Sequence, residues 1–284
     1  HRPYRHRYLW RAPVSRAVRP IILAIGGHDP TGGAGIQADI ETIGQLGGQA
    51  VTIPTAITLQ NSHQVVGFEP VAAHLLSQQG RMLLEEFPIA AIKIGMVANV
   101  ENCEAIQALL RPHPEIPLLI DPVLAGGGGG TLSRRALAES IRTRLLPLAM
   151  LSTPNRSELQ QLVPEEEDLE ACASALHAIG CHNLLVTGTD HPLPGESTAQ
   201  VYHQLYQKGG AVHPFNSPRL PHHYHGSGCT LSSAITTRIA QGAPLQQAIM
   251  DGLAFTRESL QHGSQPAEGQ YFPHRLFRQQ AEYK

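Results

Sequence analysis

The sequence has little charge, few lysines and no long apolar run, and each absence excludes a class of protein. Charged residues make up 15% of the 284 residues and hydrophobic residues 42%, which is too apolar for a wholly disordered chain. No apolar stretch approaches the roughly 18 residues that a membrane-spanning helix needs. The formal net charge of −2 gives no case for a nucleic acid or a membrane as partner.

Cysteine is also scarce. The four cysteines are Cys103, Cys172, Cys181 and Cys229. They form no C-x-x-C pair, and nothing in a chain of this size suggests a secreted disulfide framework. For three of them we expect buried thiols in a reducing cytoplasm. Cys229 differs, because it follows two glycines in the segment 226–229.

Residues 1–20 lack acidic residues altogether and carry six arginines. A basic segment on an acidic body is typical of a disordered tail. The segment lacks the apolar stretch of about 7–15 residues that a secretory signal has, and its near lack of serine weakens the alternative of a transit peptide. We expect residues 1–20 to be a disordered leader and residues 21–284 to form one domain.

Short apolar runs alternate with segments of helical periodicity along most of the chain. Strands are expected at 21–25, 51–57, 90–94, 118–121, 150–153 and 184–187, with a hairpin at 201–206 and 212–215. Helices are expected at 36–46, 73–86, 101–110, 133–146 (with Ser133 as N-cap), 169–179, 230–241 and 245–262. This alternation predicts an α/β fold with a central, mostly parallel sheet and helices on both faces. Ligands of such folds bind at the carboxyl ends of the strands.

The first candidate loop is the glycine-rich segment 26–35. Residues 33–38 match the G-x-G-x-x-A dinucleotide pattern, but that pattern should open directly after a strand, and about seven residues intervene here. The glycine density lets a ligand approach the backbone closely. Asp39 lies one turn into the next helix and could face such a ligand. A glycine-rich connection without a ligand is the alternative.

Three further loops carry polar side chains after strands. The planar amide of Gln60 could pair with the edge of an aminopyrimidine, although a solvated loop glutamine is the simpler interpretation of that residue alone. Asp121 suits a Mg²⁺ or phosphate site, or merely starts a turn. Asn155 and Glu158 could face one Mg²⁺-bound water shell, form a capping box, or do both.

The segment 225–231 is the most specific signal. Gly226, Ser227 and Gly228 precede a strongly helical stretch, and backbone N–H groups at a helix N-terminus form an anion site. The segment is not a P-loop, because G-K-[ST] is missing. The helix dipole would lower the pKa of Cys229 and favour its thiolate. The spacing of His222, His223 and His225 matches no common zinc pattern.

Six segments occur together in a recognisable order. They are Gly-Gly-His-Asp-Pro-Thr-Gly-Gly-Ala-Gly-Ile-Gln-Ala-Asp at 26–39, Leu-Gln-Asn at 59–61, Lys-Ile-Gly-Met at 93–96, Asp-Pro-Val at 121–123, Thr-Pro-Asn-x-x-Glu at 153–158 and Gly-Ser-Gly-Cys-Thr-Leu at 226–231. From about residue 21 to the second C-terminal helix, the chain resembles the hydroxymethylpyrimidine/phosphomethylpyrimidine kinases of thiamine biosynthesis, in the ribokinase-like superfamily.

The resemblance implies an ATP- and Mg²⁺-dependent kinase, typically a homodimer, that phosphorylates 4-amino-5-hydroxymethyl-2-methylpyrimidine and then its monophosphate. The implied pyrimidine pocket comprises Gly27, Ala34, Asp39, Gln60, Met96 and Val123. The implied phosphoryl and nucleotide side comprises the anion hole Gly226, Ser227 and Gly228, the nucleotide-binding residues Asn155, Thr187 and Gly188, and the Mg²⁺ side Asp121 and Glu158. Cys229 takes the position where sugar kinases of this superfamily keep an aspartate base. The alternatives are a pyridoxal kinase and a non-catalytic pyrimidine-binding sensor.

The chain departs from this family in its lysines. The only three are Lys93, Lys208 and Lys284. Many relatives have Lys-Gly-Gly-His where this chain has Thr-Gly-Thr-Asp-His at 187–191, and a lysine where it has five glycines at 126–130. Phosphate charge must then be met by Mg²⁺, by an arginine or by a helix dipole.

Overall fold

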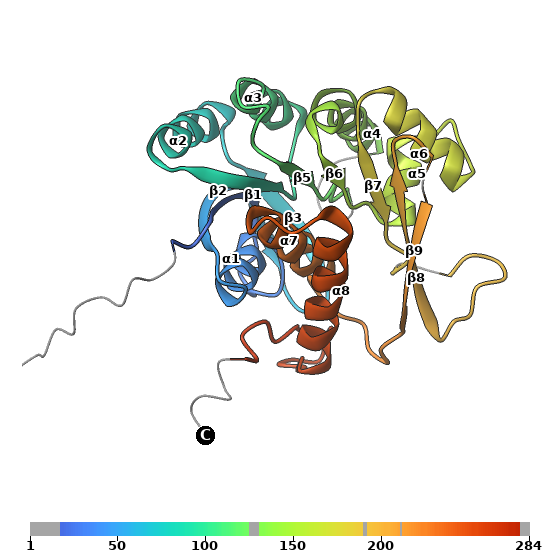
Figure 1. Ribbon diagram of the computed structural model, residues 1–284. Helices are drawn as coiled ribbons and strands as arrows, with labels where there is room; N and C mark the ends of the chain where they lie inside the picture. The colour runs from blue at the N-terminus through green and yellow to red at the C-terminus, as the bar shows by residue number, and fades with distance from the viewer. Residues whose placement is uncertain (1–17, 125–130, 190–191, 211, 279–284) are drawn as a thin grey trace, which may run out of the picture.

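The computed structural model describes residues 18–124, 131–189, 192–210 and 212–278 (Figure 1). Most of the expected leader and the five glycines at 126–130 therefore lie outside the described residues. Within the described part of the chain, no helix is both long and apolar enough to cross a membrane.

The described strands form one nine-stranded sheet in the order β3-β2-β1-β4-β5-β6-β7-β8-β9. They are β1 (Ile21–His28), β2 (Gln49–Gln60), β3 (Val65–Pro70), β4 (Ile89–Ile94), β5 (Leu118–Ile120), β6 (Leu151–Ser152), β7 (Asn183–Val186), β8 (Gln200–Gln207) and β9 (Val212–Pro218). The six central strands β2, β1, β4, β5, β6 and β7 are parallel, and β3, β8 and β9 run antiparallel to their neighbours. The expectation of a mostly parallel sheet is confirmed.

Helices cover both faces of the sheet, as expected (Figure 1). They are α1 (Gly35–Gln45), α2 (Ala73–Glu86), α3 (Val100–Leu110), α4 (Thr131–Ser140), α5 (Arg156–Leu162), α6 (Leu169–Ala178), α7 (Ser227–Ala240) and α8 (Leu245–Gln261). One layer consists of α1, α7 and α8, and the other of α2 to α6. A π-helical turn (Ile141–Leu145) and a 3-10 turn (Leu146–Leu148) continue α4.

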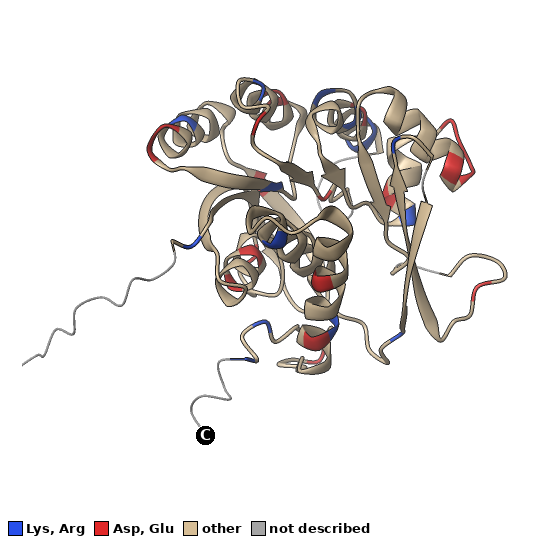
Figure 2. Ribbon diagram, in the orientation of Figure 1, with Lys and Arg blue, Asp and Glu red and all other residues tan. Residues whose placement is uncertain are grey.

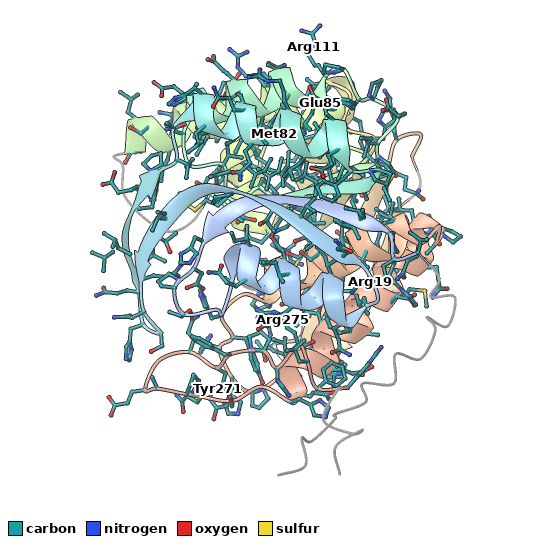
Figure 3. All side chains as sticks on the ribbon, turned by 90° about the vertical axis from the view of Figure 1, so that its left-hand side faces the viewer. Arg19, Met82, Glu85, Arg111, Tyr271 and Arg275 are labelled. Carbon is teal, nitrogen blue, oxygen red and sulfur yellow. The ribbon has the colours of Figure 1, made fainter. Side chains whose placement is uncertain are left out.

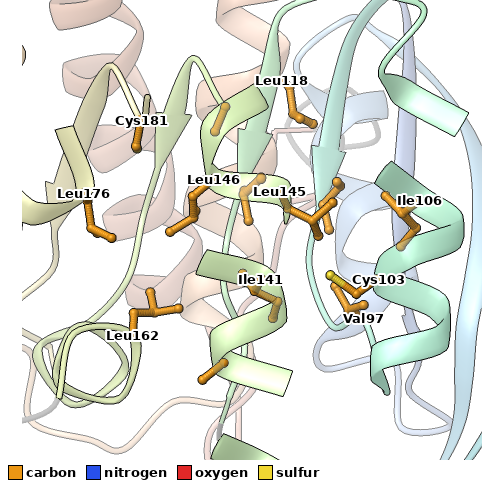
Figure 4. Packing of buried hydrophobic residues seen from close by; sticks show 14 of the residues in the cluster. Val97, Cys103, Ile106, Leu118, Ile141, Leu145, Leu146, Leu162, Leu176 and Cys181 are labelled. Carbon is orange, nitrogen blue, oxygen red and sulfur yellow. The ribbon is translucent and has the colours of Figure 1, made fainter. Parts of the chain in front are cut away.

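The core lies on both sides of the sheet because successive side chains of a strand point to opposite faces. In β5, Leu118 and Ile120 join the larger cluster under α2 to α6, whereas Leu119 joins the cluster under α7 and α8. Figure 4 shows the larger cluster, where Cys103 and Ile106 of α3 belong to the same cluster as Leu118. Cys103, Cys172 and Cys181 are buried free thiols, as expected.

Several element boundaries differ from the expectation. β1 does not end at Ile25 but continues to His28, because its ladder with β2 runs on through the two glycines with one register shift. Ser133 lies inside α4 and is not its N-cap. The edge strand β3 was not expected from the sequence. The expected hairpin is confirmed as β8 and β9.

Acidic and basic residues are interspersed along the described part of the ribbon (Figure 2). The clearest acidic group is the loop between α5 and α6, which contains Glu165, Glu166, Glu167 and Asp168.

Candidate active site

Asp29 anchors the glycine-rich loop between β1 and α1. Its carboxylate accepts hydrogen bonds from the backbone N–H groups of Thr31 and Ala34 at 2.8 Å, and it lies 2.8 Å from His225 Nε2. Burial acts to raise the pKa of Asp29, but the bonds from His225, Thr31 and Ala34 outweigh it and lower the pKa to about 2. The ionised carboxylate therefore holds this loop against the segment that precedes α7.

Gly27, Ala34 and Met96 come together at the end of β1. A Cβ on Gly27 would lie 2.9 Å from Met96 Sδ, so a side chain there would displace Met96. Gly35 has φ +63° and lies so close to the Gly27 carbonyl that a Cβ would clash with it. Its neighbour Ala34, the N-cap of α1, therefore also lies near Gly27. Thr55 Oγ1 donates to Met96 O at 2.5 Å and fixes this residue. Three of the residues assigned to the pyrimidine pocket thus meet.

Gln60 is the last residue of β2 and not a loop residue, because β2 continues to pair with β3 as far as Val65. Its Nε2 donates to Thr58 Oγ1 at 2.6 Å, and Thr58 Oγ1 in turn donates to His28 O at 2.8 Å. This chain of bonds ties the half-buried amide to the end of β1. Val123 follows β5 and is also partly exposed.

Asp39 is wholly buried and pairs with a cation. Lys93 Nζ lies 2.9 Å from Asp39 Oδ1, and Ser233 Oγ donates to the same oxygen at 2.6 Å. Asp39 Oδ2 has no hydrogen-bond partner among the described residues. Burial acts to lower the pKa of Lys93, but Asp39, Cys229 and Asp121 raise it above its usual value, so the amine is charged. Contact between Asp39 and a pyrimidine stays a prediction.

Asp121 follows β5 and faces the first turn of α7. Thr153 Oγ1 and Ser232 Oγ donate to its carboxylate at 3.3 and 3.4 Å, and a Cβ on Gly228 would lie 3.6 Å from its Oδ2. Burial raises the pKa of Asp121, with Lys93 acting in the opposite direction. Asp121 thus connects the buried charges to the exposed Gly228.

Helix α7 begins at Ser227, in the segment where we expect an anion-binding turn. Gly226 is its N-cap with φ +75°, and a side chain there would clash with the Gly33 carbonyl. The Gly226 carbonyl accepts from Thr230 N at 3.0 Å and from Thr230 Oγ1 at 2.8 Å. The first turn of a helix directs N–H groups away from the helix body, so those of Ser227, Gly228 and Cys229 can bind an anion.

The prediction that the pKa of Cys229 is lowered, so that its thiolate is favoured, is wrong. The residue is partly exposed, but desolvation of its thiol is the largest influence and raises its pKa to about 11. Asp39 and Asp121 raise the pKa further, and Lys93 and the Gly35 N–H group only partly oppose them. At neutral pH the thiol is therefore protonated.

The expected nucleotide side lies at the ends of β6 and β7. Asn155 and Glu158 form the capping box of α5: Asn155 Oδ1 accepts from Glu158 N at 2.8 Å, and Glu158 Oε2 accepts from Asn155 N at 2.9 Å. Asn155 also pairs with Thr187 in a parallel bridge. A Cβ on Gly188 would lie 3.1 Å from Arg156 Nη2 and clash with the Tyr202 carbonyl. The structure thus brings Asn155, Glu158, Thr187 and Gly188 together.

Two arginines lie where the sequence lacks lysines. Buried Arg156 makes a bidentate bond to Glu196 at 2.8 and 2.7 Å. Arg219 donates to the carbonyl of Gly188 at 3.4 Å and to that of Thr189 at 3.3 Å. Arg156 lies inside the Thr-Pro-Asn-x-x-Glu motif, a signal that could have singled it out. Arg219 follows β9 with no local signal.

Sequence reasoning also missed the contact between His225 and Asp29 and the hydrogen bonds of buried Arg275 to Thr230 and to the Gly32 and Gly33 carbonyls, because all of them join segments far apart in the chain. The histidines before α7 form no metal site: among residues 18–124, 131–189, 192–210 and 212–278, no group of three His, Cys, Asp or Glu side chains could hold a metal ion.

This sheet, with helices on both faces and an anion-binding turn at the start of α7, defines a kinase of the ribokinase-like fold. The structure is similar to that of the pyridoxal kinase of Bacillus subtilis, determined as an ADP complex, with a TM-score of 0.80 and 26% identity over 92% of this chain and 99% of that chain.

The sequence comparisons narrow this class to one family. The family model of phosphomethylpyrimidine kinase matches residues 29–274. The chain is 35% identical over 243 residues to the hydroxymethylpyrimidine/phosphomethylpyrimidine kinase of Streptomyces coelicolor, covering 84% of this chain and 87% of that protein. It is 37% identical over 244 residues to the thiamine biosynthesis bifunctional protein ThiED of Geobacter sulfurreducens, covering 84% of this chain but 48% of that relative. The chain belongs to the phosphomethylpyrimidine kinase family.

Proposed function

We propose that this protein transfers the γ-phosphoryl group of ATP to the hydroxymethyl oxygen of 4-amino-5-hydroxymethyl-2-methylpyrimidine, and then a second phosphoryl group to the monophosphate. In the first step the new O–P bond forms at the hydroxymethyl oxygen, and the bond between the γ-phosphorus and its bridging oxygen breaks with ADP as the leaving group. The hydroxyl proton passes late in the step to an oxygen of the transferred phosphoryl group or to water. In the second step the nucleophile is already a phosphate oxygen and needs no base.

One observation carries this proposal: the turn at 226–229 packs against the glycine-rich loop 26–35, to which we assign the pyrimidine. The carbonyl of Gly33 packs against Gly226, so the loop that would hold the pyrimidine touches the turn that would hold the phosphoryl group. Phosphoryl transfer depends mainly on such positioning and on neutralisation of charge. A protonated Cys229 thiol suits hydrogen bonding to the hydroxymethyl group better than removal of its proton.

We assign the nucleotide to the ends of β6 and β7, with Asn155, Thr187 and Gly188 in contact with it. Asp121 and Glu158 supply carboxylate oxygens, the ligand type that Mg²⁺ prefers, and Mg²⁺ commonly keeps several waters. Bound there, the ion would neutralise phosphate charge. Arg219 would supply positive charge that the missing lysines do not, whereas the charge of Arg156 is paired with Glu196.

The test is mass spectrometry of the products formed with MgATP from three separate substrates: the pyrimidine alcohol, its monophosphate and pyridoxal. We expect the monophosphate and diphosphate from the pyrimidine alcohol. Diphosphate only from the monophosphate would restrict the proposal to the second step. Absence of any phosphorylated pyrimidine would contradict the proposal and, with tight pyrimidine binding, would favour the sensor.

Pyridoxal phosphorylation is the second candidate, favoured by the structural likeness to the pyridoxal kinase of Bacillus subtilis. The sequence favours the pyrimidine, because identity to the Streptomyces coelicolor relative is 35% against 26% to that pyridoxal kinase. Pyridoxal phosphate as the sole product would move the assignment.

We further propose a homodimer in the cytoplasm, a compartment that suits four free thiols. The edge hairpin of β2 and β3 exposes Ile57, Leu59 and Val66 by 56, 58 and 67%, and such apolar side chains on a sheet edge favour association. Light scattering should report a dimer for the protein and a monomer for Leu59→Glu. A monomeric wild-type protein would contradict this assignment.

A further inference from the structure

The C-terminal segment 269–275 contacts three loops of the site at once. Gln270 N donates to Ser62 O at 2.9 Å, which ties it to the turn between β2 and β3. Tyr271 N donates to His223 O, and its own carbonyl accepts from His225 N, both at 2.9 Å, which ties it to the segment before α7. In Figure 3, Tyr271 marks this segment, and Arg275 lies between it and helix α1.

Arg275 makes the connections of longest range in this segment. Its side chain is 1% exposed although it carries a guanidinium group. Nε donates to Thr230 Oγ1 at 2.8 Å in the first turn of α7. Nη1 donates to the Gly32 carbonyl at 3.3 Å and to Glu41 Oε2 at 3.1 Å, and Nη2 donates to the Gly33 carbonyl.

The position of the Arg275 guanidinium is unfavourable for stability by itself. Burial of a charge is costly, and a cation close to the N-terminus of a helix opposes the helix dipole. The hydrogen bonds offset these costs by joining the glycine-rich loop, α1 and α7 through one rigid planar group. The guanidinium also lies beside the N-cap, since a Cβ on Gly226 would lie 2.8 Å from Nη2. The positive charge thus sits behind the anion-binding turn, where it favours a phosphoryl group.

We propose that Arg275 is a positioning residue for phosphoryl transfer, which holds the glycine-rich loop at a fixed distance from the first turn of α7. The proposal rests on the proposed function, because it assigns the pyrimidine to that loop and the phosphoryl group to that turn. Arg275 touches neither of them. Its loss should therefore misplace the hydroxymethyl oxygen without disturbing the nucleotide side at Asn155 and Gly188.

The test compares Arg275→Met with Arg278→Met. Arg278 lies three residues after Arg275 but is exposed and pairs with Glu258 at 3.5 Å, away from the loops of the site. For Arg275→Met we expect the KM for the pyrimidine to rise about tenfold and kcat to fall on the order of tenfold to a hundredfold, with the KM for MgATP unchanged. Arg278→Met should match the wild-type protein in all three constants.

Arg275→Lys distinguishes geometry from charge. Lysine keeps the positive charge but cannot donate in three directions from one rigid plane. We expect the pyrimidine KM to stay raised as in Arg275→Met, because the retained charge does not restore the bonds that join the loop to α7. A fall in kcat that follows only the loss of folded protein, with both KM values unchanged, would overturn the proposal and leave Arg275 a structural residue.

Two measurements keep the proposal testable if Arg275→Met does not fold or if the pyrimidine is not the substrate. Thr230→Val removes the acceptor on α7 while leaving the bonds of Arg275 to the loop, and an unchanged pyrimidine KM in this variant would contradict the coupling. Amide hydrogen exchange needs no activity: Arg275→Lys should exchange faster than Arg278→Met at Thr31, Gly33 and Ala34. Equal exchange would overturn the proposal, whereas failure to phosphorylate any pyrimidine would overturn only the proposed function.

Discussion

At the residue scale, Lys93 is the buried cation on which the charge balance of the site depends. Its amine lies 2.9 Å from Asp39, and both Asp121 and Cys229 act on its pKa. One positive charge therefore serves two carboxylates beneath the anion-binding turn. Without it, two acidic groups would remain buried together with no cation to compensate them.

Lys93→Met should consequently destabilise the protein by about 3–5 kcal/mol, the usual cost of leaving a buried charge without its partner. Urea unfolding measures this. Lys208→Met makes the same substitution at an exposed lysine of the β8–β9 turn and should change stability by less than about 0.5 kcal/mol. Adding Asp39→Asn to Lys93→Met should recover part of the loss. A double variant less stable than Lys93→Met would contradict the pairing.

Substitution of Cys229 should affect the two phosphorylation steps to different extents. Cys229→Ala should lower kcat for the pyrimidine alcohol about tenfold to a hundredfold, because the hydroxyl loses a partner that orients it. The monophosphate brings its own anionic nucleophile and should be affected less. Product formation from each substrate measures both rates, and Cys229→Ser should retain more of the first step than Cys229→Ala. Equal losses in both steps would make Cys229 a structural residue.

The pKa of Cys229 shows where residue patterns stop being informative. The glycines and the helical pattern after them correctly predicted that a helix begins here, because those features are local in sequence, and anion binding at this turn stays a prediction. The dipole of that helix predicted a lowered pKa. The opposite result follows from burial and from Asp39 and Asp121, which reach Cys229 only through the fold. The contact of Asp29 with His225 was unpredictable for the same reason, since the two residues are 196 positions apart.

At the scale of elements, local signals predicted the helices well and the ends of strands less well. The capping residues of α5 mark its start in the sequence, and the structure has the same capping box. β1 continues through Gly26 and Gly27 because both residues pair with β2. Glycine itself has a weak preference for strands, so the sequence did not predict this extension. β3 is a short edge strand with Gly67 inside it and Pro70 at its end, a composition that weakens any strand pattern.

The N-cap of α5 offers a test of the nucleotide side. Asn155→Ala removes the cap and should cost about 1 kcal/mol of stability. If Asn155 also contacts the nucleotide, the KM for MgATP should rise severalfold while the KM for the pyrimidine stays unchanged.

Asp168→Ala is the matched control, since Asp168 caps α6 by accepting from Ala171 N at 3.1 Å. It should lose comparable stability without any change in either KM. A KM for MgATP that is the same in the two variants would remove Asn155 from the nucleotide site.

At the scale of the whole molecule, the fold class followed from the alternation of strands and helices, and the edge that carries the site followed from the rule on parallel strands. The order of the strands in the sheet could not be predicted from the sequence. β1 lies between β2 and β4, and this order depends on which face of the sheet each connecting helix covers, which the alternation of strands and helices does not specify. The burial of polar groups in the outer strands was equally invisible. His203 lies in β8 between Tyr202 and Gln204, which are partly exposed, yet it is only 4% exposed itself.

His203 should make stability depend on pH. Desolvation lowers its pKa to about 4, and the positive charges of Arg156 and Arg219 act in the same direction. Its folded pKa thus lies below the value of about 6.5 expected in the unfolded chain, so the unfolded state binds the proton first. The free energy of unfolding is therefore unaffected by His203 above about pH 6.5. As the pH drops toward 4, protonation of this residue in the unfolded state lowers the free energy of unfolding by about 3 kcal/mol.

Urea unfolding at several pH values between 7 and 4 tests this expectation by comparing His203→Leu with the wild-type protein. The variant cannot take up the proton, so its free energy of unfolding should fall less over that window. His63→Leu makes the same change at an exposed histidine in the turn before β3 and serves as the control for the substitution itself. If the free energies of unfolding of His203→Leu and the wild-type protein fall in parallel with pH, protonation of His203 is not the cause of the loss of stability.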